Sequence, residues 1–217
     1  MTVKAQGTAD LMRNAHDPIP RFGDRRRMRV GLLGGSFNPA HEGHRHIAEL
    51  ALRRLRLNQV WLLVSPGNPL KPRAGMAPFA KRLWGAARIG DGRRVIATGI
   101  EAALGTRYTV DTMRELRRRF PCVQFVWIMG ADILAELPRW RRWRDIVRDV
   151  PLVVLPRPLY TNRALAGQAA HRLRAKRRRP EEATLLPGAA PGWVFLPGRQ
   201  NATSATAIRQ AAEGTVP

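Results

Sequence analysis

The chain has 217 residues, of which 38 are lysine or arginine and 16 are aspartate or glutamate, so its formal net charge is +22. Hydrophobic residues make up 44% of the chain, close to the globular average, and this excludes general disorder. No apolar run reaches the roughly 18 residues of a spanning helix, and the first 20 residues lack a signal-peptide core. The single cysteine, Cys122, excludes an intramolecular disulfide and a cysteine-based metal cage. We therefore expect a soluble cytoplasmic protein without a membrane partner.

The positive charge is compatible with a nucleic-acid partner, because basic surfaces gain affinity by releasing counterions from phosphate. However, 34 of the 38 basic residues are arginine, and they are dispersed in short clusters along the chain. A GC-rich genome also produces such a bias at neutral surface positions. No RNA-binding aromatic signature, zinc finger or helix-turn-helix pattern is evident. We therefore favour a phosphate-rich small substrate, which this field would attract equally well, and keep a basic nucleic-acid-binding protein as the non-enzyme alternative.

Short apolar runs alternate with helical patterns along most of the chain. The runs cover residues 29–33, 59–64, 94–97, 123–129, 151–155 and 193–196. Continuous apolar runs are typical of strands covered on both faces. The alternation predicts an α/β fold with a Rossmann-like, doubly wound and mostly parallel sheet.

Two segments depart from this alternation. Residues 1–28 lack periodicity and contain Pro18, Pro20 and Gly23, which predicts a flexible extension before a single domain over residues 29–217. Residues 161–191 are rich in arginine, alanine and proline, and we expect one arginine-rich helix and a loose loop there.

The segment after the first run, GGSFNPAHEGH, is rich in chemistry, and ligands of open parallel sheets bind at such strand ends. Gly34 and Gly35 permit a tight turn and close approach to a ligand, and Ser36 offers a hydroxyl. His41 and His44 lie three residues apart at a predicted helix start, where anions are favoured. The plain alternative is a capped helix start with surface histidines. A metal site would need a third ligand, so we predict none.

A second loaded segment, RQNATSATAIRQ, lies near the other end of the chain. Its serine and threonine residues suit a helix N-cap. The free amides of that helix start and Arg209, one turn later, would form a phosphate cradle. An ordinary capped helix explains this segment equally well in isolation.

Both segments resemble signatures of the nucleotidyltransferase superfamily with the HxGH motif, which transfers nucleotidyl groups to phosphate-bearing acceptors. GGSFNPAHEGH is similar to (G)(S/T)FDPxHxGH, with Asn38 where aspartate is common, and TSATAIR is similar to (I)SSTxxR, with Thr203 for isoleucine and Ala205 for the second serine. The resemblance implies a nucleotidyltransferase-type fold. The catalytic residues that it implies are His41, His44 and Arg209, and the ATP-binding residues are Gly34, Gly35, Ser36, Phe37, Ser204 and Thr206.

The middle of the chain resembles bacterial nicotinate-nucleotide adenylyltransferases, and with both signatures the resemblance covers about residues 29–210. The matching segments are residues 65–71, 107–112, 130–132, 137–140 and 157–158. This implies adenylyl transfer from ATP, which brings Mg²⁺ with it, to nicotinate mononucleotide. Pantetheine-phosphate adenylyltransferases, which are shorter and lack the YTVDT, GAD and LPxW series, are the second candidate.

Five further residues receive roles from this resemblance. Trp140 would stack on the pyridine ring and Thr109 would meet the nicotinate carboxylate. Lys71 and Arg157 would meet the acceptor phosphate, although Lys71 follows a leucine where the family commonly has histidine. Asp132 would bind the ATP adenosine through its ribose. Packing for Trp140, a helix N-cap for Asp132 and a surface charge for Arg157 are the plain alternatives, and the sequence leaves an oligomer open.

Overall fold

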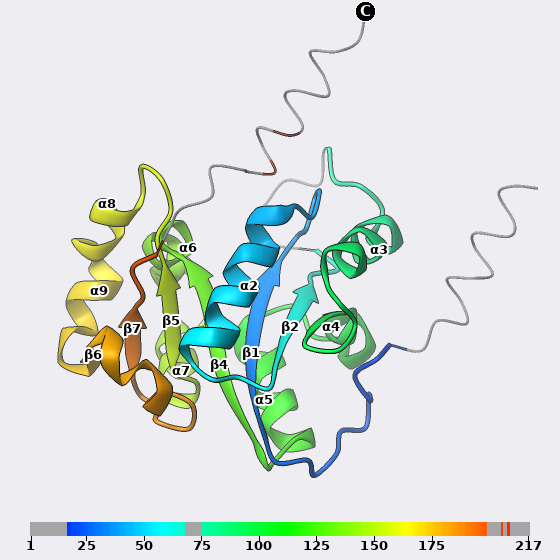
Figure 1. Cartoon of the computed structure of the whole chain (residues 1–217), viewed down its shortest axis with the longest axis horizontal. Coiled ribbons are helices and arrows are strands. Elements are labelled where there is room, and N and C mark those ends of the chain that lie inside the picture. Colours follow the sequence, from blue (N-terminus) through cyan, green and yellow to red (C-terminus); the bar gives the residue numbers. More distant parts are fainter. Residues whose placement is uncertain (1–16, 68–74, 199–204, 206–207, 209–217) are drawn as a thin grey trace, which may run out of the picture.

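The computed structural model describes residues 17–67, 75–198, 205 and 208, which form a seven-stranded sheet with the order β3-β2-β1-β4-β5-β7-β6 (Figure 1). The strands are β1 (Met28–Gly35), β2 (Gln59–Val64), β3 (Val95–Thr98), β4 (Val123–Gly130), β5 (Leu152–Leu155), β6 (Arg177–Arg178) and β7 (Trp193–Phe195). All six pairings are parallel. The strand order reverses between β1 and β4, and such a switch point opens a crevice at the carboxyl ends of the strands.

The helices follow the strands in alternation, as the sequence predicts. They are α2 (Glu42–Arg54), α3 (Phe79–Ile89), α4 (Ile100–Leu104), α5 (Thr109–Arg119), α6 (Ala131–Glu136), α7 (Trp143–Asp149), α8 (Thr161–Leu165) and α9 (Gln168–Arg172), with the 3₁₀ helices η1 (Leu137–Arg139), η2 (Arg174–Lys176) and η3 (Pro180–Leu185). Within the described part of the chain, no helix is long and apolar enough to cross a membrane.

Each central strand supplies side chains to two hydrophobic cores, one on either face of the sheet. In β1, Val30 and Leu32 join the core with α5, α6 and α7, whereas Leu33 joins the core with α2 and α3. In β4, Trp127 and Ile128 divide in the same way. Burial on both faces is why these strands read as continuous apolar runs. The predicted parallel α/β fold and its six strands are therefore confirmed, with boundaries within two residues.

The prediction of one arginine-rich helix in residues 161–191 is wrong. The segment contains α8 and α9, which have five residues each, the 3₁₀ helices η2 and η3, and the two-residue strand β6. Gly167 separates α8 from α9 as the N-cap of α9. The Trp193 indole NH then donates to the Leu173 carbonyl at 2.9 Å, which fixes the end of α9 against β7. Arg177 and Arg178 are exposed and join the sheet through their backbone, so no apolar pattern marked them.

Part of the predicted N-terminal extension packs against the domain. We call residues 17–23 the N-terminal strap. The Asp17 carboxylate accepts hydrogen bonds from the Thr98 hydroxyl and the Gly99 amide, both at 2.6 Å. Ile19 is 2% exposed and belongs to the core of α5. Residues 1–16 lie outside the described residues, so the domain boundary near residue 28 stays a prediction.

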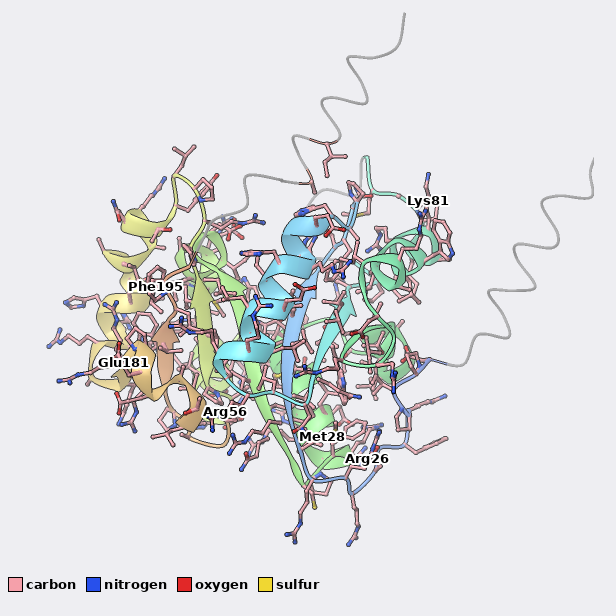
Figure 2. The ribbon with its side chains drawn as sticks, viewed as in Figure 1. Arg26, Met28, Arg56, Lys81, Glu181 and Phe195 are labelled. Atoms are coloured by element: carbon pink, nitrogen blue, oxygen red, sulfur yellow. The ribbon has the colours of Figure 1, made fainter. Side chains whose placement is uncertain are left out.

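Basic side chains are spread widely over the described surface. Arg26, Arg56 and Lys81 are all exposed and lie on separate parts of the molecule (Figure 2). Many arginines are held by neighbouring acidic groups, as in the exposed pair of Arg45 with Glu49 at 2.9 Å. Positive charge in the described part is therefore not confined to one face.

Candidate active site

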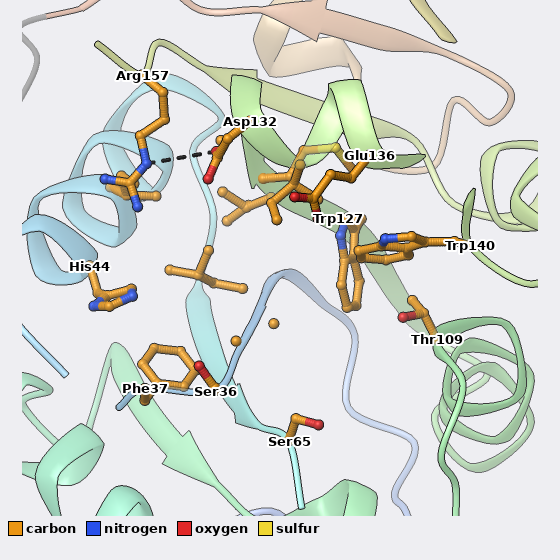
Figure 3. A pocket seen from close by; sticks show the side chains of 18 of the residues that line it. Ser36, Phe37, His44, Ser65, Thr109, Trp127, Asp132, Glu136, Trp140 and Arg157 are labelled. Carbon is orange, nitrogen blue, oxygen red and sulfur yellow. Dashed lines mark ion pairs between the residues drawn. The ribbon is translucent and has the colours of Figure 1, made fainter. Parts of the chain in front are cut away.

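A cavity of about 990 Å³ lies at the carboxyl ends of β1 and β4, where the strand order reverses (Figure 3). The loops after β1, β2, β4 and β5 and the start of α5 contribute to its wall. Ten residues named from the sequence line it: Gly34, Gly35, Ser36, Phe37, His41, His44, Thr109, Asp132, Trp140 and Arg157. Residues separated by more than a hundred positions therefore meet in one place.

The remaining residues named from the sequence lie outside the described residues. They are Lys71, Ser204, Thr206 and Arg209. Ala205, which lies between two of them, is described and lines the same cavity. Their roles stay predictions.

The turn after β1 depends on a glycine and on an unusual backbone conformation. A Cβ on Gly34 would come within 2.8 Å of the Trp127 ring, so glycine leaves room for this indole to pack directly on the backbone of β1. Phe37 has a φ of 49°, in the left-handed region that few side chains adopt. Its ring is 2% exposed and lies 4.8 Å from the His44 ring, centre to centre. The turn thus sets the position of a residue in contact with the histidine pair.

The two histidines form the start of α2 together. His41 is the N-cap, and its Nδ1 accepts from the Gly43 amide at 3.1 Å. The His41 amide donates to Nδ1 of His44 at 3.3 Å, which completes a capping box. Because each Nδ1 is an acceptor, each neutral ring carries its proton on Nε2. The ring centres are 3.9 Å apart, so the pair can present two neighbouring N–H donors.

His41 is neutral over the physiological pH range. Burial lowers its pKa from 6.5 to about 4, and the positive charge of Arg157 contributes to the same shift. Its side chain is 6% exposed, so water solvates the charged form poorly. A neutral imidazole donor suits a site for phosphate oxygens, because its proton is retained.

This shift predicts a pH-dependent stability. His41 binds a proton less readily in the folded protein than in the unfolded chain. The free energy of unfolding is therefore highest above pH 6.5, and it falls by up to about 3 kcal/mol as the pH drops toward 4. Asparagine is also a good N-cap, and His41→Asn is expected to remove this part of the acid sensitivity. Urea unfolding of both proteins at the two ends of this pH window measures it. If the free energies of unfolding of the wild type and His41→Asn differ by the same amount at both pH values, the assignment is contradicted.

Asp132 and Arg157 face each other in the wall of the cavity (Figure 3). Asp132 Oδ1 lies 3.7 Å from Arg157 Nε, and this buried oxygen has no hydrogen-bond partner among the described residues. Gly130 is the N-cap of α6, and Asp132 makes no capping bond. The Arg157 side chain is 23% exposed, which is low for a surface charge. Both groups are thus available to a polar ligand in the cavity.

The opposite end of the cavity is aromatic. The Trp127 and Trp140 rings meet edge to face, with centres 6.1 Å apart and an interplanar angle of 85°. Trp140 is half-buried against the core and also lines the cavity, so one residue both packs on the core and borders the cavity. Thr109, the first residue of α5, lies beside this end (Figure 3).

The cavity also contains charged residues that the sequence reasoning missed. Arg107, Arg139 and Arg141 line it, and the Arg141 guanidinium lies 4.7 Å from the centre of the Tyr108 ring. Burial raises the pKa of Glu101, a further lining residue, to about 7, although a hydrogen bond to its carboxylate opposes the shift. Arg107 and Arg141 adjoin the YTVDT and LPxW segments and Arg139 lies within the latter, and this position was the one available signal.

Asn38, where the superfamily commonly has aspartate, holds the neighbouring loop. Its Nδ2 donates to the Gly75 carbonyl at 2.9 Å, and its Oδ1 accepts from the Ala77 amide at 3.1 Å. A carboxylate could replace the acceptor but not the donor. The departure from the signature is therefore matched to this loop.

Asn38→Asp is expected to lower the free energy of unfolding by about 1–3 kcal/mol, because the Gly75 carbonyl would lose its donor and face a carboxylate. Urea unfolding provides the measurement. Asn58→Asp is the matched control, since among the described residues the Asn58 side chain only accepts a bond, from the Arg29 amide at 2.8 Å. Equal changes in the two variants would contradict the prediction.

Among the described residues, no group of three or more histidine, cysteine, aspartate or glutamate side chains is placed to hold a metal ion.

Comparison with known proteins agrees with this geometry. The sequence model of the family described as cytidylyltransferase-like matches residues 32–211. A probable nicotinate-nucleotide adenylyltransferase of Gluconacetobacter diazotrophicus is 57% identical over 195 residues, which cover 89% of this chain and 91% of the relative. A protein of the same description from Gluconobacter oxydans is 57% identical over 187 residues, with 86% and 96% coverage.

A solved structure shares the fold at much lower identity. The Plasmodium falciparum nicotinic acid mononucleotide adenylyltransferase complexed with NaAD has a TM-score of 0.64 and 13% identity, covering 85% of this chain and 83% of that one. The family model matches most of the chain, and the two relatives are each more than half identical to it. The family is therefore shown by the sequence as well as by the fold. The chain belongs to the cytidylyltransferase-like family and, within it, to the nicotinate-nucleotide adenylyltransferases.

Proposed function

We propose that the protein transfers the adenylyl group of ATP to nicotinate mononucleotide, giving nicotinate adenine dinucleotide and pyrophosphate, a step of NAD biosynthesis in the cytoplasm. One observation carries this proposal: a single cavity joins a histidine pair at a helix N-terminus to an aromatic end lined by arginines. Phosphate oxygens suit the first part, and a pyridine ring with an anionic substituent suits the second. The volume of about 990 Å³ lies within the range of sites for molecules of this size.

ATP would occupy the part of the cavity around the turn after β1. Gly34, Gly35, Ser36 and Phe37 line this part and allow the triphosphate to approach the backbone. We assign Ser204, Thr206 and Arg209 to the β- and γ-phosphates, and Asp132 to the ribose of adenosine. The unpartnered Oδ1 of Asp132 supports this last assignment, because a ribose hydroxyl would supply the missing donor. Mg²⁺ would enter bound to the triphosphate as part of the substrate.

The reaction is an in-line displacement at the α-phosphorus. An oxygen of the acceptor 5′-phosphate forms the new P–O bond, and the bond to the bridging oxygen breaks with its electron pair leaving on pyrophosphate. The attacking group is already an anion, so neither a protein nucleophile nor a strong base is required. Catalysis consists of alignment and of hydrogen bonds to the charge on the α-phosphate. The Nε2–H groups of His41 and His44 would donate these bonds.

The acceptor would bind at the aromatic end. We assign Trp140 to stacking on the pyridine ring and Thr109 to the nicotinate carboxylate. Lys71 and Arg157 would meet the acceptor phosphate. The position of Arg157 near both Asp132 and His41 supports its role, since a phosphate held there would lie next to the histidine pair.

Replacing Trp140 is expected to affect the acceptor and not ATP. Trp140→Ala should raise the KM for nicotinate mononucleotide by about tenfold, the equivalent of an aromatic stacking contact, whereas Trp140→Phe should retain most of it. Steady-state kinetics with each substrate varied in turn tests this. Trp84→Ala is the matched control, because Trp84 is an exposed tryptophan on α3 that does not line the cavity. An equal rise in the KM for ATP would contradict the stacking role.

The proposed function is tested by pyrophosphate release from ATP with a panel of acceptors. Nicotinate mononucleotide, nicotinamide mononucleotide and phosphopantetheine are the three informative ones. Turnover with nicotinate mononucleotide is expected, and the ratio to the nicotinamide form measures selectivity for the carboxylate. Turnover with phosphopantetheine alone would overturn the proposal in favour of a pantetheine-phosphate adenylyltransferase.

A further inference from the structure

Arg82, on α3, is a buried cation that is bonded to backbone carbonyls. It is 3% exposed, and its guanidinium donates to the carbonyls of Ser36 at 2.7 Å, Ser65 at 2.8 Å and Ala77 at 2.9 Å, with a fourth, longer bond of 3.5 Å to Pro66. Within the part of the chain that the structure describes, no carboxylate lies within ion-pair distance of it. Burying a charge without a carboxylate partner is costly. We therefore expect the hydrogen bonds of Arg82 to have a role that offsets this cost.

The acceptors of Arg82 belong to two loops at the same edge of the sheet. Ser36 follows the end of β1, and Ser65 follows the end of the neighbouring strand β2. A single nitrogen, Nη1, bonds both carbonyls. Both serines line the cavity (Figure 3). Arg82 therefore links two loops of the cavity wall by hydrogen bonds, and it does not itself line the cavity.

The bond to Ser36 also sets the direction of the next amide. The Ser36–Phe37 peptide is trans, so its C=O and N–H point to opposite sides. With the carbonyl held by Arg82, the Phe37 N–H points away from α3, and it has no acceptor among the described residues. The Phe37 ring in turn touches His44. One buried guanidinium thus sets both an amide at the cavity and the residue that packs on a histidine of the pair.

We propose that Arg82 is a positioning residue for the adenylyl transfer: by holding the Ser36 and Ser65 carbonyls, it aligns the Phe37 amide and His44 with the reacting phosphate. This inference rests on the proposed function. An arginine is suited to the task because its planar fork carries five donors and stays charged when buried. Lysine would keep the charge but could not reproduce the fork. A displacement of about 1 Å in a catalytic loop can cost about 10²-fold in rate.

The test compares Arg82→Lys and Arg82→Met with the wild type and with Arg94→Met. Arg94 is the matched control, because its guanidinium donates to the Leu57 carbonyl at 3.1 Å at the opposite, amino-terminal end of the strands. Pyrophosphate release is measured at saturating nicotinate mononucleotide with ATP varied. Thermal unfolding of each variant sets an assay temperature at which all are folded. Arg82→Lys retains a charged donor and keeps the test valid if Arg82→Met does not fold.

We expect kcat to fall about 100-fold in Arg82→Met and about tenfold in Arg82→Lys, with a smaller change in the KM for ATP. Arg94→Met should keep its kcat within about twofold even where its melting temperature falls. A kcat of folded Arg82→Lys equal to that of the wild type, with only the melting temperature lowered, would overturn the inference and leave Arg82 a structural residue. Failure of the wild type to release pyrophosphate with these substrates would overturn the proposed function, and the inference with it.

Discussion

Replacing His44 by alanine is expected to lower kcat about 10²- to 10³-fold while the protein stays folded. The His41 amide fixes the His44 ring through Nδ1, so that a neutral ring presents Nε2–H as a donor prepared before the substrate arrives. Removal of one such donor to a developing charge typically costs this much in rate. The measurement is pyrophosphate release at saturating ATP and nicotinate mononucleotide.

His46→Ala is the control for this variant. His46 lies on the same helix two residues later and does not line the cavity, so its removal should leave kcat within about twofold. His44 gives a cleaner test than His41, which is also the helix N-cap and contributes about 0.5–2 kcal/mol in that role. Unchanged turnover in His44→Ala would refute the catalytic assignment.

The fold could be predicted where buried strands appear in the sequence as apolar runs. β1, β2, β4 and β5 are covered on both faces, and their continuous apolar runs follow from that. The strand β6 could not be found in this way. It consists of two exposed arginines at the edge of the sheet, and only its backbone pairing with β7 makes it a strand. Backbone pairing of this kind has no residue-type signature.

The candidate site could be predicted where its residues form a distinctive motif within a short stretch of the sequence. The glycine turn and the histidine pair of residues 34–44 are such a case, and the parallel topology brings them to Asp132 and Arg157. The roles of Arg82 and Arg141 could not be read in the same way, because each is one of 34 arginines. Burial against carbonyls 17 and 46 residues away distinguishes Arg82. Such distant contacts arise only when the chain folds.

The same limit applies to the N-terminal strap, where Asp17→Ala is expected to lower the free energy of unfolding by about 3 to 5 kcal/mol. The variant would leave the buried Thr98 hydroxyl and Gly99 amide without the carboxylate that now accepts from both at 2.6 Å. Hydrogen bonds to a charged group are worth about 1.5–3 kcal/mol each, and unpaired buried donors are costly. Urea unfolding measures the loss.

Asp24→Ala is the matched control for the strap. Among the described residues Asp24 bonds only the exposed Arg26, two residues later, so its removal should change the free energy of unfolding by less than about 1 kcal/mol. Equal losses of unfolding free energy in the two variants would show that the Asp17 carboxylate adds nothing to the stability of the domain. A large loss in Asp17→Ala alone would extend the folding unit back to residue 17. The turn between β3 and α4, which leads to Glu101 in the cavity wall, would then depend on a residue outside the sheet.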